Sequence, residues 1–391
     1  MKVALVHDWL TGMRGGEKCL EVLCELFPDA DIFTLVHRAG TVSEAIEKHR
    51  IETSFLQGMP FAKRWYRYYL PLMPMAVEAF DLMAYDLVVS SSHCVAKGAI
   101  AAPHAVHVSY VHTPMRYIWD LWPRYFPRQG IIGTTLAPVF LTYLRQWDTA
   151  SAARVDRFVA NSAFVARRIR RYYGREAEVV HPPVDTDLFR PMGKSRDGYL
   201  MVSALVPSKG VELAIDAFNA LRRRLTIVGT GPLERRLRDR AGPTVQLVGR
   251  LADAELCDAY ASARAVVHTA VEDFGIVALE ANAAGCPVIA LGRGGSLETV
   301  IPRGEVGRGK VPGHDLCSAT GILFHDETVQ ALKDAILRFE EDPDGFDPAR
   351  LREHAERFRR GLYKERMRDL ISDALRAEPG SGAAPVSWVR P

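Results

Sequence analysis

The sequence has little of what disulfide-stapled, membrane-spanning or nucleic-acid-binding proteins require. Its six cysteines are scattered over 391 residues with no C-x-x-C pair, which argues against a disulfide framework or a zinc ribbon. The longest uncharged stretch, residues 129–144, is shorter than the roughly 20 apolar residues of a spanning helix. The first ten residues hold too short an apolar run for a signal peptide. A formal net charge of only +3 gives no reason to expect nucleic acid. We therefore expect a reduced, cytoplasmic protein that crosses no membrane.

Short apolar strands alternate with amphipathic helices along the whole chain. Residues 3–7 and 106–111 read as strands, and residues 17–27 and 211–221 as helices. This alternation indicates an α/β fold with doubly wound parallel sheets. At 391 residues the chain is too long for one hydrophobic core, so we expect two domains. The polar segment 190–198 has no apolar period and is predicted to be the linker.

Residues 265–290 carry the strongest functional signal. A short β-branched strand leads into a polar loop and then into a predicted helix over residues 276–284. A loop at the carboxyl end of a parallel strand presents free N–H groups and the positive end of a helix, which can hold a diphosphate. Glu272 and Glu280 flank this place, and carboxylates accept paired hydrogen bonds from the vicinal hydroxyls of a sugar or a ribose. The alternative is that both acids only stabilise the helix dipole.

Further candidates stand directly after predicted strands, where open α/β sheets place their ligands. His112 follows the strand over residues 106–111, and Lys209 follows a strand over residues 199–203, from where an ammonium can reach a diphosphate. The other candidates are glycines, which allow close approach to backbone amides, and polar or aromatic residues of the same loops: Gly15, Gly16, Arg116, Tyr117, Gly229, Gly231 and Arg250. Each also has a purely structural explanation as part of a turn or loop.

The segment EDFGIVALE, residues 272–280, resembles the E-x7-E element of the retaining nucleotide-sugar glycosyltransferases of family 4, which have the GT-B fold. Other motifs follow one another in the family's order along nearly the whole chain: a Gly-Gly loop, HTP, NS, PPVD, LVPSKG, VGTGP and VGR. The resemblance is closest to bacterial mannosyltransferase-like members that act in surface polysaccharide assembly. It implies two Rossmann-like domains facing a central cleft, with acceptor residues in 1–189 and donor residues in 199–350. It also implies that helices within residues 351–391 return to the first domain, ahead of a flexible tail.

The resemblance assigns a role to each matching residue. Glu272 and His112 would position the donor sugar, Lys209 would stabilise the leaving diphosphate, and Glu280 would bind the ribose. The remaining donor contacts that it implies lie between the two acids: Asp273, Phe274, Gly275, Ile276 and Val277. Transfer would proceed with retention of configuration and without a metal ion. One departure is Ala204, which stands where the family usually has an arginine; Arg250 and Arg293 are candidates to compensate.

The expected donor is GDP-mannose, and the expected acceptor is lipid-linked or a saccharide. Residues 61–74 mix three cations with five aromatic residues, which suits peripheral contact with the cytoplasmic face of the inner membrane. An amphipathic helix that covers the sheet is an equally good explanation of this segment. Two other classes of function stay open: a nucleotide-sugar binding protein without catalytic activity, and a GT-B sugar-nucleotide epimerase.

Overall fold

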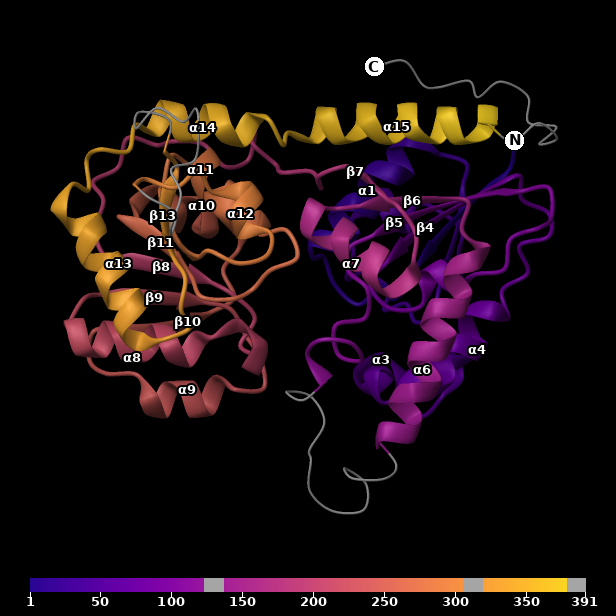
Figure 1. The fold of residues 1–391 in the computed structure, drawn as a ribbon, viewed down its shortest axis with the longest axis horizontal. Helices are drawn as coiled ribbons and strands as arrows, with labels where there is room; N and C mark the ends of the chain where they lie inside the picture. Colours follow the sequence, from indigo (N-terminus) through magenta and orange to yellow (C-terminus); the bar gives the residue numbers. More distant parts are fainter. Residues whose placement is uncertain (123–136, 305–318, 378–391) are drawn as a thin grey trace. The chain divides into compact units, whose positions relative to one another are not determined.

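The computed structural model describes residues 1–122, 137–304 and 319–377 (Figure 1). Their contacts divide the chain into two compact units. The first domain consists of Met1–Pro183 together with the described residues from Gly361 on, and the second domain is Val184–Arg360. Both are layered α/β structures, so the predicted fold class is confirmed.

The first domain contains a seven-stranded sheet in which every neighbouring pair of strands is parallel. The strand order is β3-β2-β1-β4-β5-β6-β7. Consecutive strands therefore diverge from β1, and the crevice where this order reverses lies at the carboxyl ends of β1 and β4. The strands are β1 (Val3–His7), β2 (Asp31–Thr34), β3 (Ile51–Thr53), β4 (Leu87–Ser92), β5 (Val106–Val111), β6 (Arg157–Ala160) and β7 (Glu178–Val179).

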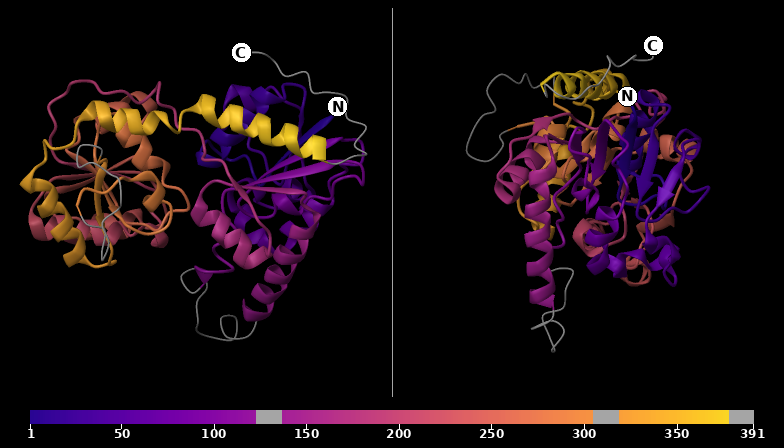
Figure 2. Two further views of the ribbon diagram at one scale, coloured as in Figure 1. Left: turned by 45° about the horizontal axis from the view of Figure 1, so that its top comes forward. Right: turned by 90° about the vertical axis from the view of Figure 1, so that its right-hand side faces the viewer.

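Helices cover both faces of this sheet (Figures 1 and 2). Successive residues of β1 point to opposite faces, so Leu5 joins one hydrophobic cluster and Val6 the other. The cluster around Leu5 includes α1 (Gly15–Leu26) and α15 (Arg360–Ala377). The cluster around Val6 includes α4 (Met73–Glu78) and α6 (Ala137–Ser151). The segment Ala163–Tyr173 forms α7 beside β6.

The second domain contains a six-stranded parallel sheet in the order β10-β9-β8-β11-β12-β13. Here the order reverses between β8 and β11. The strands are β8 (Tyr199–Val202), β9 (Leu225–Val228), β10 (Val245–Gly249), β11 (Ala265–His268), β12 (Val288–Leu291) and β13 (Gly321–Phe324). The helices are α8 (Val211–Leu221), α9 (Glu234–Arg240), α10 (Asp253–Ser262), α11 (Ile276–Ala283), α12 (Ser296–Thr299), α13 (Val329–Glu341) and α14 (Pro348–Glu356).

The division by contacts differs from the predicted boundaries at two places. The chain joins the second domain at Val184 rather than after residue 189, because Phe189 is buried against Tyr260 with 5.4 Å between ring centroids. The predicted C-terminal helix pair is shared between the domains. α14 packs on α11 of the second domain, whereas α15 contributes Met367 and Ile371 to the core of the first.

The cation-rich segment 61–74 forms short turns rather than one amphipathic helix. It contains α3 (Ala62–Trp65) and the 3-10 helix η2 (Tyr66–Leu72), and it ends in the first turn of α4. Tyr66 points inward, whereas Trp65 is 52% exposed. None of the helices that the structure describes has the length and hydropathy of a membrane span.

Candidate functional site

The loop between β11 and α11 ends in a conformation that leaves helix amides available. Gly275 precedes α11 with a φ of +97°, in the left-handed region that favours glycine. Ile276 and Val277 follow in the first turn, where N–H groups have no acceptor within the helix. The side chain of Phe274 is buried and lies 5.8 Å from the ring of Phe358, which anchors the loop in the core. This turn can therefore present two amides and a helix dipole to an anion.

A second glycine-rich loop supports the one that carries Glu272 and Asp273. The N–H of Gly295 donates to the carbonyl of Glu272 at 2.8 Å. A Cβ atom on Gly294 would lie 2.4 Å from that same carbonyl oxygen, so only glycine allows the two backbones to approach this closely. The loop of residues 292–295 leads into the short helix α12 and also fixes the position of the Glu272 backbone.

The side chains of Lys209 and Glu272 meet at the carboxyl ends of β8 and β11. Their Nζ and Oε1 atoms are 2.5 Å apart, and the two side chains are 28% and 21% exposed. The hydroxyl of Thr269 donates to the carbonyls of Lys209 and Gly210, which fixes the turn that carries the lysine. His268 Nε2 lies 3.6 Å from Glu272 Oε1. Burial lowers the pKa of His268, so the ring is neutral near pH 7.

Glu280 is held from α10 on the buried side of α11. Its side chain is 7% exposed, and Oε2 accepts a hydrogen bond from the hydroxyl of Tyr260 at 3.0 Å. A buried carboxylate is costly unless it is hydrogen bonded, so this partner stabilises it. Glu272 and Glu280 are therefore in different environments, one paired with a cation and the other with a phenol.

Gly229 and Gly231 are required by close backbone contacts. A Cβ atom on Gly229 would lie 1.8 Å from the carbonyl oxygen of Ser203, and one on Gly231 would lie 2.4 Å from that of Leu205. Their loop hydrogen bonds to the loop that follows β8, with the N–H of Leu205 donating to the carbonyl of Thr230 at 3.0 Å. These contacts account for both glycines without a ligand, so their role in substrate binding stays a prediction.

Two arginines could compensate for the missing arginine at Ala204, and they differ in their surroundings. Arg293 lies 3.8 Å from Asp326 and 3.9 Å from Glu327, so acids already neutralise it. Arg250 is exposed and forms no ion pair with any of the residues that the structure describes. Arg250 is thus the better placed of the two to accept a new anion.

In the first domain His112 belongs to a buried polar cluster at the ends of β1, β4 and β5. The hydroxyl of Ser91 bridges two rings, at 2.8 Å from His112 Nε2 and 3.1 Å from His7 Nδ1. Gly16 lies over the same rings, because a Cβ atom there would be 3.5 Å from His7 and 3.6 Å from His112. Gly15 has open space at its Cβ position. The structure therefore brings His112 and Gly16 together, as the prediction of one site requires.

Asp8 holds the loop that follows β4 against this cluster. Its carboxylate accepts four backbone N–H bonds, two at Oδ2 from His93 and Cys94 and two at Oδ1 from Val95 and Ala96, at 2.7 to 2.9 Å. His93 Nδ1 is also 3.1 Å from Oδ2. An Asp that satisfies this many amides fixes the loop rigidly.

Burial sets the charge state of the cluster. It lowers the pKa of His7, His93 and His112 to about 3 in each case; repulsion from the neighbouring rings adds to the effect at His7 and His112. Burial also raises the pKa of Glu17, next to Gly16, to about 7. The rings are therefore neutral hydrogen-bonding groups at pH 7, and Glu17 is the group that titrates near neutrality.

Arg116 and Tyr117 are held by internal contacts. Arg116 Nε donates to Asp120 at 3.3 Å. The hydroxyl of Tyr117 shares a hydrogen bond of 2.7 Å with the thiol of Cys94. The Tyr117 hydroxyl therefore points at Cys94 rather than away from the protein, and its predicted contact with substrate would have to use the ring.

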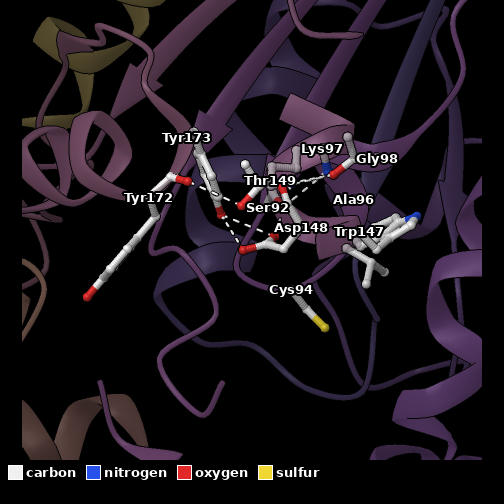
Figure 3. Close-up of polar contacts among 12 residues, drawn as sticks. Ser92, Cys94, Ala96, Lys97, Gly98, Trp147, Asp148, Thr149, Tyr172 and Tyr173 are labelled. Atoms are coloured by element: carbon white, nitrogen blue, oxygen red, sulfur yellow. Dashed lines mark hydrogen bonds and ion pairs between the residues drawn. The ribbon is translucent and has the colours of Figure 1, made fainter. Parts of the chain in front are cut away.

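A buried ion pair between Lys97 and Asp148 anchors the loop after β4 to α6 (Figure 3). Lys97 is fully buried, and its Nζ donates to the carbonyl of Asp148 and to Ser151 at 2.6 Å, with Asp148 Oδ1 at 3.0 Å. Asp148 also accepts hydrogen bonds from the indole of Trp119 and from the hydroxyl of Tyr173. This network ties α6 and α7 to the segment that Asp8 holds.

Sequence reasoning missed the residues that support the site. His7 is the last residue of β1 and Asp8 follows it, so their position at a strand end was a usable signal. Glu17 was hidden because it reads as an ordinary acid in a first helical turn. His268 lies within an apolar strand and gave no signal. Within the described ranges, no group of three or more His, Cys, Asp and Glu side chains is arranged to hold a metal ion.

Each domain has a doubly wound parallel sheet with polar groups gathered where the strand order reverses. This arrangement defines the class of two-domain nucleotide-dependent α/β proteins. Comparison with protein families is more specific. The model described as Glycosyltransferase Family 4 matches residues 13–188, and the model described as Glycosyl transferases group 1 matches residues 192–361. The two matches are consecutive and leave little of the chain unassigned. The chain therefore belongs to the family 4 glycosyltransferases.

Curated relatives match about half of the chain. A GDP-mannose-dependent α-(1-6)-phosphatidylinositol monomannoside mannosyltransferase of Mycobacterium tuberculosis is 34% identical over 246 residues, 54% of this chain and 59% of the relative. A D-inositol 3-phosphate glycosyltransferase of Thermomonospora curvata is 31% identical over 231 residues, 49% of this chain and 52% of the relative. The matches thus span little more than half the length of each of these relatives.

Among solved structures, sucrose-phosphate synthase from Thermosynechococcus elongatus superimposes with a TM-score of 0.71 at 18% identity, covering 97% of this chain and all of that one. Identity this low supports the fold alone, which is GT-B.

Proposed function

We propose that this protein is a retaining glycosyltransferase that moves a hexose, most simply mannose from GDP-mannose, to a lipid-linked or saccharide acceptor. The observation that carries the proposal is the meeting of Lys209 and Glu272 beside the first turn of α11. An ammonium and free helix amides suit the diphosphate of a nucleotide sugar, and a carboxylate suits the sugar hydroxyls. The family and the mannosyltransferase relatives support the same reaction.

The proposed reaction exchanges one bond at the anomeric carbon. The oxygen of an acceptor hydroxyl bonds to that carbon as the bond to the diphosphate oxygen breaks. The proton of the hydroxyl passes to the leaving phosphate, and a nucleoside diphosphate departs. Lys209 and the α11 amides stabilise the charge that develops on the leaving group, so no metal ion is needed in this scheme.

The residue roles in this scheme follow the family resemblance. Glu272 and the neutral ring of His112 position the sugar, and Glu280 binds the ribose. In the ligand-free protein Lys209 is already paired with Glu272. Binding of a diphosphate would give the lysine a stronger partner and release the carboxylate for sugar hydroxyls.

Peripheral contact with the inner membrane is part of the proposal. Its support is the exposure of the aromatic residues that precede α4: Phe61 is 81%, Trp65 52% and Tyr68 78% exposed. Exposed aromatic rings beside cations suit the interfacial region of a bilayer. A lipid-linked acceptor would be presented at that surface.

Donor turnover tests the proposal. The purified protein is incubated with GDP-mannose or UDP-glucose, and release of the nucleoside diphosphate is followed over time. We expect slow hydrolysis of one donor without an acceptor and faster release with a lipid extract. Nucleotide binding without turnover of any donor would instead support a binding protein without catalytic activity. A thermal-shift series with GDP, UDP and ADP identifies the base, since a ligand that binds only the folded state raises its stability.

A further inference from the structure

A cavity of about 620 Å³ opens in the first domain, beside the loop that follows β1. Five of its lining residues are cations, and none is an acid. Two come from the loops after β1 and β2 and three from the segment of α3 and η2. The lining residues are Thr11, Arg14, Arg38, Lys63, Arg64, Tyr66 and Arg67.

No acid of the described part of the chain lines this cavity; Glu17, which feels the charge of Arg14, is buried and does not line it. Within the described ranges none of the five cations forms an ion pair, whereas other exposed cations of the same domain do. Lys48 lies 2.9 Å from Glu44, and Arg50 lies 3.4 Å from Glu52. Cations gathered around a concave surface repel one another and focus a positive field. A ligand with several negative charges would remove this repulsion.

The cavity is connected to the polar cluster around His112. Tyr66 in its wall lies 4.9 Å from Trp9, and Trp9 lies 4.4 Å from His93, measured between ring centroids. Arg14 immediately precedes Gly15 at the start of α1. Arg14 and Arg67 add to burial in lowering the pKa of His93, which shows that both guanidinium groups act on the cluster. A group bound in the cavity would therefore lie close to the part of the first domain assigned to the reaction.

The size of the cavity and the exposed side chains of the same segment indicate what kind of ligand could bind. A volume of about 620 Å³ is that of a small-molecule site, more than a single phosphate fills. Phe61 and Trp65 belong to the segment that lines it, and both side chains are exposed. Exposed aromatic side chains thus belong to the same short segment as three of the lining cations.

We propose that this cavity binds the phosphate or diphosphate group of a phosphorylated acceptor. The proposal rests on the proposed glycosyl transfer and specifies the chemical class of its acceptor. Guanidinium groups suit this ligand because each can donate two parallel hydrogen bonds to phosphate oxygens. The phosphate would come either from a lipid-linked acceptor or from a water-soluble sugar phosphate.

Binding of inorganic pyrophosphate tests the proposal on the full chain. All proteins carry Lys209→Met, which weakens any binding at the donor loop. The test variant adds Arg64→Gln and Arg67→Gln. The control adds Lys48→Gln and Arg50→Gln, which remove the same charge from exposed cations outside the cavity. Tryptophan fluorescence reports binding, since the ring of Trp9 lies 4.9 Å from that of the lining residue Tyr66 and Trp65 is adjacent to Tyr66 in the sequence. The same titration with farnesyl diphosphate distinguishes a lipid-linked acceptor from a water-soluble sugar phosphate.

We expect the pyrophosphate Kd to rise at least tenfold in the test variant and to stay within twofold in the control. If farnesyl diphosphate binds more tightly than pyrophosphate, the acceptor is lipid-linked. If the two bind equally, the acceptor is a water-soluble sugar phosphate. Equal Kd values in test and control variants would overturn the proposal. Binding to vesicles with 30% phosphatidylglycerol is measured as well. If the test variant loses vesicle binding but keeps pyrophosphate binding, the proposal is also overturned, because the cations would then form only a membrane-binding surface. GDP binding by the protein with Lys209 intact is measured separately, so failure of the donor site is distinguishable from failure of the cavity.

Discussion

The two domains hold their polar groups at the strand ends in opposite ways. In the first domain His7 and Asp8 are buried and His112 is partly buried, and internal hydrogen bonds hold all three. In the second domain Lys209 and Glu272 are about a quarter exposed and form an ion pair with each other. The first arrangement is part of the fold and keeps one geometry. The second can exchange partners when a ligand arrives, which is what the proposed donor site requires.

The sequence provides a way to observe the domains separately. Residues 184–360 contain no tryptophan, whereas five of the six tryptophans lie within residues 1–183. Intrinsic fluorescence therefore follows the first domain, and nucleotide binding follows the second. Each domain therefore has its own observable signal.

Removing Asp148 should destabilise the first domain most. Asp148→Ala leaves the ammonium of Lys97 buried without its counter-charge, which typically costs about 3–5 kcal/mol of unfolding free energy. Urea unfolding followed by tryptophan fluorescence measures the loss. The control is Glu176→Ala, whose ion pair with Arg170 is largely exposed and should contribute less than about 1 kcal/mol. Equal effects of the two substitutions would contradict a structural role for the buried pair.

Replacing Lys209 should instead affect the reaction and not the fold. Lys209→Met is expected to slow transfer by roughly 100- to 1000-fold, because it removes a preorganised charge from the leaving diphosphate. Its unfolding midpoint should stay close to wild type, since a partly exposed ion pair contributes little. Lys194→Met, which breaks an exposed pair with Asp258, is the control for charge. Transfer at the wild-type rate in Lys209→Met would exclude the assigned role.

Acid should destabilise the first domain below pH 6.5. His7, His93 and His112 have folded pKa values of about 3, below the unfolded value of 6.5, so their contribution is complete above pH 6.5 and is lost as the pH falls. At pH 5 each loses about 2 kcal/mol if it titrates independently. Glu17 acts in the opposite direction, because its raised folded pKa of about 7 makes protonation stabilising below pH 7.

Three histidines outweigh one glutamate, so a net loss of a few kcal/mol is expected between pH 7.5 and pH 5. Fluorescence-detected unfolding at a series of pH values measures it. Glu17→Gln removes the opposing contribution and should make the acid loss steeper. A stability that is constant across this range would show that the histidines are not buried as neutral rings.

The two acids of the α11 loop should have separable effects. Glu280→Ala is expected to weaken GDP binding by about tenfold, roughly the value of one hydrogen bond to a charged group. Glu272→Ala should chiefly slow transfer while GDP still binds. Calorimetry and initial rates distinguish these outcomes. Tyr260→Phe removes the hydroxyl that holds Glu280 and should reproduce part of the Glu280→Ala effect. Negligible effects from both glutamates would contradict the roles assigned to them.

The sequence predicted the fold well where the local pattern was strong. The strands Val3–His7 and Val106–Val111 and the helix Val211–Leu221 have the predicted boundaries. β2, β3 and β13 were not predicted, because each has only three or four residues and β3 contains one apolar residue. Such strands are defined by neighbours in the sheet rather than by their own pattern.

The candidate site was predictable in part. Position after a strand identified His112 and Lys209, and the structure places Lys209 beside Glu272. The pairing itself was not predictable, because 63 positions separate the two residues. The same holds for Asp8, whose amide partners are 85 to 88 positions away. The predicted contacts with substrate stay predictions.

The central claim is that the second domain binds the diphosphate of the donor through Lys209 and the first turn of α11. Calorimetric titration of GDP and of guanosine into wild type and Lys209→Met tests it most directly. The account predicts that Lys209→Met weakens GDP binding at least tenfold and leaves guanosine binding unchanged, because only GDP carries the diphosphate. Equal affinity of wild type and Lys209→Met for GDP would contradict it.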